Sequence, residues 1–192
     1  AHLAAVRSPE LFRSCSMLAI APVKRLPAAL LKVPEQLLRS GYMGFFQLPL
    51  VPEWLLRRNG LAGVKWLWRR WSPGWDPADH LDEAYRTLAQ PGVLTAALGW
   101  YRHLPRVWTG SNRQARSWLA SPARVPTMVL LGMQDGCMSH RLIDDNINLK
   151  DFPAGLRVEK IAGVGHFLHL EKPERINDLL LAHLRQYSGD CN

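Results

Sequence analysis

Two segments of the sequence place an acid and a base directly after short apolar runs. The run 126–132 leads into Asp135, and a later run that ends near Ile161 leads into Gly163-Val164-Gly165-His166. In open α/β sheets, ligands bind beyond the carboxyl ends of the strands. An aspartate there can accept a hydrogen bond from an imidazole, fix its tautomer and leave the other ring nitrogen as a general base. We therefore predict that Asp135 and His166 form an acid–base pair, with flanking glycines that allow the tight turn.

The remaining histidines and the cysteines do not show the spacing of a metal or disulfide site. His169 lies between two leucines, which favours a structural role. The other histidines are predicted to be surface or core residues: His2, His80, His103, His140 and His183. The cysteines are far apart, odd in number and without a CxxC pair: Cys15, Cys137 and Cys191. We therefore predict no metal and no disulfide framework, and we favour a reducing compartment.

The elements that must position the pair are those of an α/β core. Three short apolar runs are typical of buried parallel strands, at 15–21, 126–132 and 156–161. Helix-like segments follow the second and third runs and end near Lys150 and Tyr187, which predicts parallel βαβ units. Open parallel sheets usually have about 4 to 6 strands or more. Part of the sheet is therefore expected to lie outside this sequence.

The segment between the first two runs is of a different kind. Residues 25–116 are rich in Leu, Trp and Arg at helical spacing, are broken by eight prolines and contain no convincing strand. We predict an α/β core formed by residues 1–24 and 121–192, with a helical domain inserted at residues 25–120. No internal repeat is visible.

The net charge of +8 is concentrated in the first part of the chain. Residues 1–75 hold 11 basic and 3 acidic side chains, whereas residues 76–192 hold 13 of each. Within residues 57–71, five basic side chains are interleaved with three tryptophans and no acid. Such a mixture could bind nucleic acid or an anionic membrane surface. A helix with its cations in water and its indoles in a core is the simpler interpretation, and we predict no nucleic-acid partner.

No transmembrane segment is predicted. The longest apolar stretch, 43–56, is interrupted by polar residues and prolines, and it cannot supply the roughly 20 continuous apolar residues of a spanning helix. We predict a soluble, cytoplasmic protein. The chain begins with Ala1 rather than Met, and its first residues resemble the middle of a helix without an N-cap. We therefore expect further sequence upstream, in which any targeting signal would lie.

Longer motifs resemble the epoxide hydrolase branch of the α/β-hydrolase fold family. Residues 42–49 (YMGFFQLP) and 94–102 (LTAALGWYR) are similar to the two tyrosine motifs of that family's cap domain, and residues 163–174 (GVGHFLHLEKPE) are similar to its histidine motif. The resemblance covers nearly the whole chain. It implies the carboxy-terminal portion of an α/β-hydrolase fold with a helical cap, and a cofactor-independent enzyme that opens a small apolar epoxide to a diol through an alkyl-enzyme ester.

The resemblance also implies roles for four residues. Tyr42 and Tyr101 would donate hydrogen bonds to the epoxide oxygen, while Asp135 and His166 would activate the hydrolytic water. The chemistry is sound, because an alkoxide leaving group is very basic. Two phenols with a pKa of about 10 can stabilise its developing charge while staying protonated at neutral pH.

The resemblance does not extend to the family's nucleophile. No oxyanion loop of the HGxP type, no GxSxG and no Asp-Trp-Gly occurs among residues 1–192. We therefore expect this chain to be inactive alone, and its first strand to present an exposed edge through which it aggregates or forms a homodimer. Two alternatives stay open. One is a haloalkane or haloacid dehalogenase-like hydrolase, and the other is an inactive truncated paralogue that binds a small apolar ligand or a partner chain.

Overall fold

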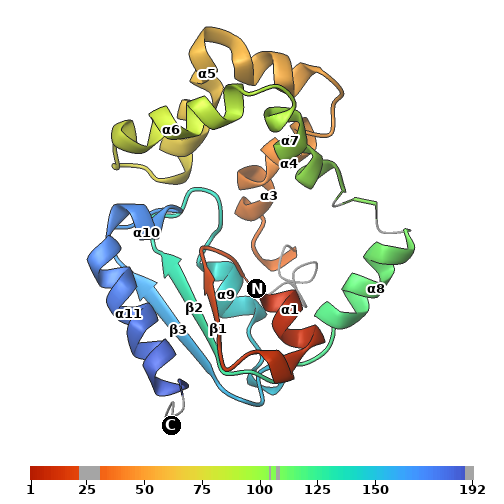
Figure 1. The fold of residues 1–192 in the computed structure, drawn as a ribbon, viewed down its shortest axis with the longest axis vertical. Helices are drawn as coiled ribbons and strands as arrows, with labels where there is room; N and C mark the ends of the chain where they lie inside the picture. Colours follow the sequence, from red (N-terminus) through yellow and green to blue (C-terminus); the bar gives the residue numbers. More distant parts are fainter. Residues whose placement is uncertain (22–30, 104, 107–108, 189–192) are drawn as a thin grey trace.

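A three-stranded parallel sheet forms the centre of one half of the protein in the computed structural model, which describes residues 1–21, 31–103, 105–106 and 109–188 (Figure 1). The strands are β1 (Cys15–Leu18), β2 (Thr127–Gly132) and β3 (Leu156–Ile161). Their order is β1-β2-β3, and both pairs are parallel. The predicted arrangement of three parallel strands is confirmed.

The first strand is shorter and less buried than predicted. The sequence predicts a run that continues to Ala21, whereas β1 ends at Leu18. Ala19 has a φ of 53°, and a residue in the left-handed region cannot continue an extended strand. Burial on both faces was expected, but alternate residues of β1, Ser16 and Leu18, are only half-buried. The reason is that β1 lies at the edge of the described sheet, with β2 as its one neighbour.

Helices cover both faces of the sheet. Val129 and Leu131 of β2 share a core with residues of α1 and α9, whereas Met128 and Leu130 share a second core with residues of α10 and α11. Every residue of β2 is buried because both of its faces are covered in this way. The elements around the sheet are α1 (His2–Arg7), η1 (Pro9–Leu11), α8 (Gly110–Leu119), α9 (Arg141–Asn146), η3 (Leu149–Asp151), α10 (Leu168–Glu171) and α11 (Pro173–Gln186).

A separate group of helices, here called the helical layer, lies beyond the carboxyl ends of the strands (Figure 1). It has its own apolar core, to which α4, α5 and α7 contribute. No strand occurs in the described part of residues 31–116, as predicted, whereas residues 25–30 lie outside the described residues. The helices of the layer are α3 (Glu35–Arg39), α4 (Gly41–Phe45), α5 (Val51–Trp71), α6 (Ala78–Ala89) and α7 (Val93–His103).

Helix α8 packs on the sheet half of the molecule although it falls within the predicted inserted domain. The guanidinium of Arg7 in α1 lies 4.8 Å from the ring centroid of Trp118 in α8, and Figure 1 shows α8 beside α1 and away from the helical layer. The predicted boundary at residues 24 and 25 lies outside the described residues. The division into 1–24, 25–120 and 121–192 therefore stays a prediction.

The longest helix, α5, has 21 residues but carries five basic side chains and a kink at Arg58–Leu61. Among the described helices, none is both long enough and apolar enough to cross a membrane.

The exposed edge of β1 leads to a first prediction, that the 192-residue chain self-associates in a concentration-dependent way. In the described structure, one side of β1 has no neighbouring strand, and an unpaired edge is a template for pairing with another chain. Analytical ultracentrifugation over a range of chain concentrations should show dimers, because the unpaired backbone groups of one copy can pair with those of another. A monomer at all concentrations would contradict the prediction.

Candidate active site

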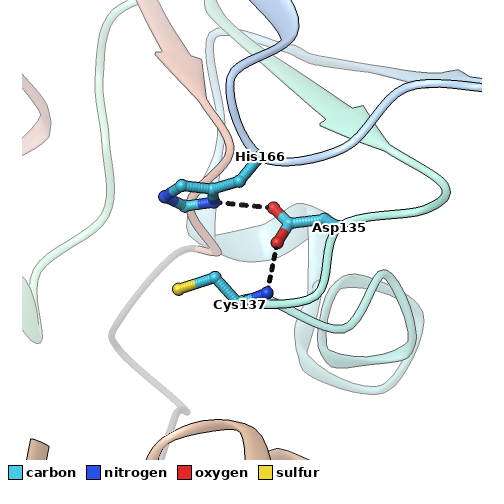
Figure 2. Close-up of side chains that lie close together, drawn as sticks. All are labelled: Asp135, Cys137 and His166. Carbon is cyan, nitrogen blue, oxygen red and sulfur yellow. Dashed lines mark hydrogen bonds and ion pairs between the residues drawn. The ribbon is translucent and has the colours of Figure 1, made fainter. Parts of the chain in front are cut away.

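Asp135 and His166 lie in direct contact beyond the carboxyl ends of β2 and β3. Nδ1 of His166 donates a hydrogen bond to Oδ2 of Asp135 at 2.8 Å, and the aspartate is only 3% exposed (Figure 2). The other carboxylate oxygen, Oδ1, accepts from the backbone N–H groups of Cys137 at 2.7 Å and Met138 at 2.8 Å. The predicted proximity of the acid and the base is confirmed. Because a carboxylate can only accept, the contact keeps the proton on Nδ1 and leaves Nε2 free to take another.

The loops that carry the pair are joined to each other by backbone hydrogen bonds. Gln134 N–H donates to the Val164 carbonyl at 2.9 Å, next to a point where a Cβ on Gly132 would collide with the backbone of Gly165. Gly163 has a φ of 70°, which favours glycine over any larger residue. The glycines therefore permit the close approach of the two loops, and that approach brings the aspartate to the imidazole.

The carboxyl end of α5 bridges the two loops. The carbonyl of Trp71 accepts from Gly136 N–H at 2.9 Å and from His166 N–H at 3.1 Å. The hydroxyl of the next residue, Ser72, which is 0% exposed, accepts from His166 N–H at 2.9 Å and donates to Glu171 Oε1 at 2.7 Å. The helical layer is thus hydrogen-bonded to the backbone of the base itself.

Sequence reasoning missed both Ser72 and Glu171. Glu171 completes the arrangement through its second oxygen, Oε2, which accepts from Gly165 N–H at 2.8 Å. The available signals were weak. Ser72 stands at a helix stop before Pro73-Gly74, and Glu171 lies within the histidine motif, five residues after His166. Neither position indicates a partner that is 99 residues away in the chain.

The Ser72 contacts predict a stability loss in Ser72→Ala. The change leaves the Glu171 carboxylate and the Phe167 N–H, which donates to the Ser72 hydroxyl at 3.1 Å, without that partner. Each unsatisfied buried group costs about 1–3 kcal/mol. We expect the free energy of unfolding in urea to fall by about 1–3 kcal/mol, whereas Ser117→Ala on the exposed face of α8 should change it by less than about 0.5 kcal/mol. Equal stabilities of the two variants would contradict the contacts.

Tyr42 of α4 and Tyr101 of α7 converge from separate helices, as predicted. Their rings meet edge to face with centroids 5.7 Å apart. The Tyr42 hydroxyl also lies 3.4 Å from the Cys137 sulfur, and the Trp71 ring lies 5.2 Å from the Tyr42 ring and 5.5 Å from the His166 ring. The two tyrosine motifs and the histidine motif are thus connected by a continuous series of side-chain contacts. That both hydroxyls point into a cavity shared with His166 stays a prediction.

Burial raises the pKa of both phenols. Loss of hydration is the main cause for Tyr42, and the nearby Cys137 adds to it. Loss of hydration is also the main cause for Tyr101. Burial raises the pKa of the Cys137 thiol to about 11. All three groups therefore carry their protons at neutral pH, so the phenols are hydrogen-bond donors there.

The raised pKa of Tyr42 predicts an altered tyrosinate signal. An ordinary phenol is half-ionised near pH 10. At this pH, ultraviolet difference spectra of the folded chain should hardly change in Tyr42→Phe. In the unfolded chain the same substitution should remove a quarter of the tyrosinate absorbance, because the chain has four tyrosines. Because the pKa of Tyr42 is higher in the folded chain than in the unfolded chain, its contribution to the free energy of unfolding is complete below about pH 10. That contribution is lost as the pH rises above this value. A quarter of the signal lost in the folded chain would contradict the assignment.

Three side chains could together face a metal ion. One ligand atom each from Asp135, Cys137 and His166 lie within 4.8 Å of one another (Figure 2). However, both carboxylate oxygens and Nδ1 already have hydrogen-bond partners, and the Cys137 sulfur lies 3.4 Å from the Tyr42 hydroxyl. The donor set therefore fits a hydrogen-bonded acid–base pair better than a metal centre.

Comparison with known proteins finds relatives that are longer than this chain. No family model matches the chain. The AB hydrolase superfamily protein YfhM of Bacillus subtilis is 31% identical over 153 residues, which are 79% of this chain and 50% of the relative. Epoxide hydrolase 4 of Mus musculus is 24% identical over 193 residues, covering 97% of this chain and 51% of the relative. The chain thus spans about half the length of the curated relatives it matches.

Solved structures agree on the fold. An epoxide hydrolase from Vigna radiata superposes with a TM-score of 0.72 at 20% identity, over 95% of this chain and 63% of that one. The Bacillus megaterium epoxide hydrolase in complex with an inhibitor gives 0.69 at 21% identity, over 94% and 63%. The chain therefore adopts a portion of the α/β-hydrolase fold. Within that fold, it resembles the epoxide hydrolases.

Proposed function

We propose that this chain supplies the acid, the base and the two oxygen-binding tyrosines of an epoxide hydrolase-like α/β hydrolase, which opens a small apolar epoxide to a diol. The observation that supports the proposal most directly is that the acid–base pair and the tyrosine pair both contact one residue, Cys137. Asp135 with His166 and Tyr42 with Tyr101 are linked through Cys137, whose N–H contacts the acid and whose sulfur contacts the Tyr42 hydroxyl. A base alone is common to many hydrolases, whereas paired phenols suit an epoxide oxygen.

The first half of the proposed reaction forms an ester. A carboxylate nucleophile from outside residues 1–192 attacks one epoxide carbon, and the bond between that carbon and the ring oxygen breaks. The oxygen leaves as a developing alkoxide and takes hydrogen bonds, and then a proton, from Tyr42 and Tyr101. Their raised pKa keeps both phenols protonated until that charge appears. No cofactor or metal is required for this step.

The second half hydrolyses the ester. Nε2 of His166 removes a proton from water, and the resulting hydroxide attacks the ester carbonyl. Asp135 stabilises the imidazolium through the 2.8 Å contact at Nδ1. Collapse of the tetrahedral intermediate releases the diol, whose leaving oxygen takes the proton of the imidazolium. The carboxyl group that remains gives up its proton to the tyrosinate formed in ring opening, which regenerates the carboxylate, the imidazole and both phenols. Aromatic rings around the two pairs, those of Phe46, Trp71 and Phe167, favour an apolar substrate.

The proposal is tested by restoring a nucleophile. A chimaera places the part of the Bacillus subtilis relative that this chain does not match ahead of residue 1. If it is soluble and folded by circular dichroism, it should convert styrene oxide to the diol, whereas the 192-residue chain should not. A folded chimaera without turnover would refute the proposal. Halide release from 1-chlorobutane or chloroacetate in place of epoxide opening would assign the dehalogenase alternative instead.

A further inference from the structure

A cavity lies beside the loop that carries Asp135. It has a volume of about 540 Å³, within the range of about 300–1,000 Å³ that is usual for small-molecule sites. Its walls come from α3, from the end of α5 and from residues 133–136 of the loop after β2. His166, Tyr42 and Tyr101 are not among the described residues that line it. The cavity therefore borders the acid–base pair through Asp135, which is among its lining residues, but it does not include the imidazole or the two tyrosines.

Three arginines line this cavity: Arg39, Arg69 and Arg70. Arg39 donates to the backbone carbonyl of Asp135, which holds its guanidinium against the loop. Among the described ion pairs, one lining arginine has a carboxylate partner, Arg69 with Asp76 at 3.8 Å. Both of those side chains are more than half exposed, and such a surface pair is weak.

The acid in the lining does not neutralise the arginines. The Asp135 carboxylate is buried and already accepts hydrogen bonds from His166, Cys137 and Met138. Three guanidiniums therefore share one cavity without a free carboxylate among its described lining residues. Guanidinium groups are matched in geometry to planar or phosphate oxyanions. An anion in the cavity would relieve the mutual repulsion of the arginines.

The rest of the lining is suited to a flat apolar group. Trp66, which is 61% exposed, and exposed Met133 are both among the lining residues. Gln134 adds a neutral side-chain donor. The tryptophan that the sequence places among basic residues in 57–71 thus joins two of those residues in one site.

We propose that this cavity binds a small aromatic carboxylate, or another organic oxyanion attached to a flat apolar ring. The arginines bind the oxyanion, and the ring stacks on Trp66. The proposal is independent of the epoxide chemistry, because the site is complete within the described residues of this chain.

The test uses 2-naphthoate as the probe and 2-naphthalenemethanol as its neutral counterpart. Isothermal titration calorimetry of the 192-residue chain should show one naphthoate site, with the alcohol bound at least about tenfold more weakly, since hydrogen bonds to charged groups contribute that much. Arg69→Gln with Arg70→Gln, and separately Trp66→Ala, should each weaken naphthoate binding by about tenfold or more. The matched control, Arg113→Gln on exposed α8, should bind like the parent.

Both sets of substitutions change exposed side chains, and circular dichroism verifies that the variants fold. Equal affinities for naphthoate and the alcohol would overturn the proposal, as would undiminished binding in the double arginine variant. A fifteen-residue oligothymidine serves as a further probe. If it binds at 0.1 M salt while naphthoate does not, the basic surface is a nucleic-acid site and the small-anion proposal is wrong.

Discussion

His166→Ala should reduce diol formation by the chimaera by about 10²- to 10⁴-fold, the range expected for loss of a positioned general base. Ring opening does not use the imidazole, because the nucleophile is a carboxylate and the phenols supply the proton. The ester should therefore form and persist. Intact-mass spectrometry of the variant after addition of styrene oxide should show the added mass of one epoxide. The unsubstituted chimaera should show little of this adduct at steady state.

The control and the companion variant separate chemistry from folding. His103→Ala changes an exposed histidine, whose ring contacts only the Gly99 carbonyl among the described partners, and it should leave turnover unchanged. Asp135→Asn should also lower turnover, since the amide can donate to Nδ1 and favour the tautomer with its proton on Nε2. Normal turnover in His166→Ala would refute the assignment of the base. A folded variant without an adduct would place the histidine in ring opening rather than in ester hydrolysis.

Loss of the paired phenols should act on the other half of the reaction. Tyr42→Phe and Tyr101→Phe should each slow ester formation roughly 10²-fold, comparable to removal of one oxyanion donor. The double variant should form no detectable ester. Hydrolysis of ester that has already formed should be nearly unaffected, because it uses Asp135 and His166. Rapid-quench measurement of adduct formation and decay separates the two steps.

A matched control for this pair lies in the same helical layer. Tyr85→Phe removes a hydroxyl from a tyrosine that packs on the edge of the same apolar core, and it should leave both steps unchanged. Equal rates of ester formation in Tyr101→Phe and in the unsubstituted chimaera would remove the evidence for epoxide chemistry. The chain would then be assigned only as part of an α/β hydrolase, without epoxides as its substrate class.

The acid–base pair could be predicted from the sequence because each member depends on local features. Short apolar runs form parallel strands, and residues directly after such strands share one edge of the sheet. Asp135 and His166 occupy those positions, with glycines where the backbone must turn or pack closely. The tyrosine positions came from longer motifs that resemble a family. Their ring contact at 5.7 Å agrees with that reading, while their role stays a prediction.

Other features could not be read from the sequence because they depend on residues far apart in the chain. The hydroxyl of Ser72 meets Glu171 across 99 residues, and Tyr42 meets Cys137 across 95. Isolated serines and cysteines occur in many roles, so their types and neighbours indicate no such partner. The burial of β1 was also overestimated, because burial depends on neighbouring strands and not on the apolar run itself.

The sequence by itself determined which segments become strands, which become helices, and where an acid and a base leave the sheet. Periodicity and turn chemistry act over a few residues, and these are visible in any single stretch of chain. The tertiary structure decided that α5 ends against both loops, so that Trp71 and Ser72 hold the backbone of the base. It also decided that Arg39 joins Arg69 and Arg70 around one cavity. These placements follow from the packing of the helical layer against the loops at the carboxyl ends of the strands, which depends on the whole set of buried contacts at once.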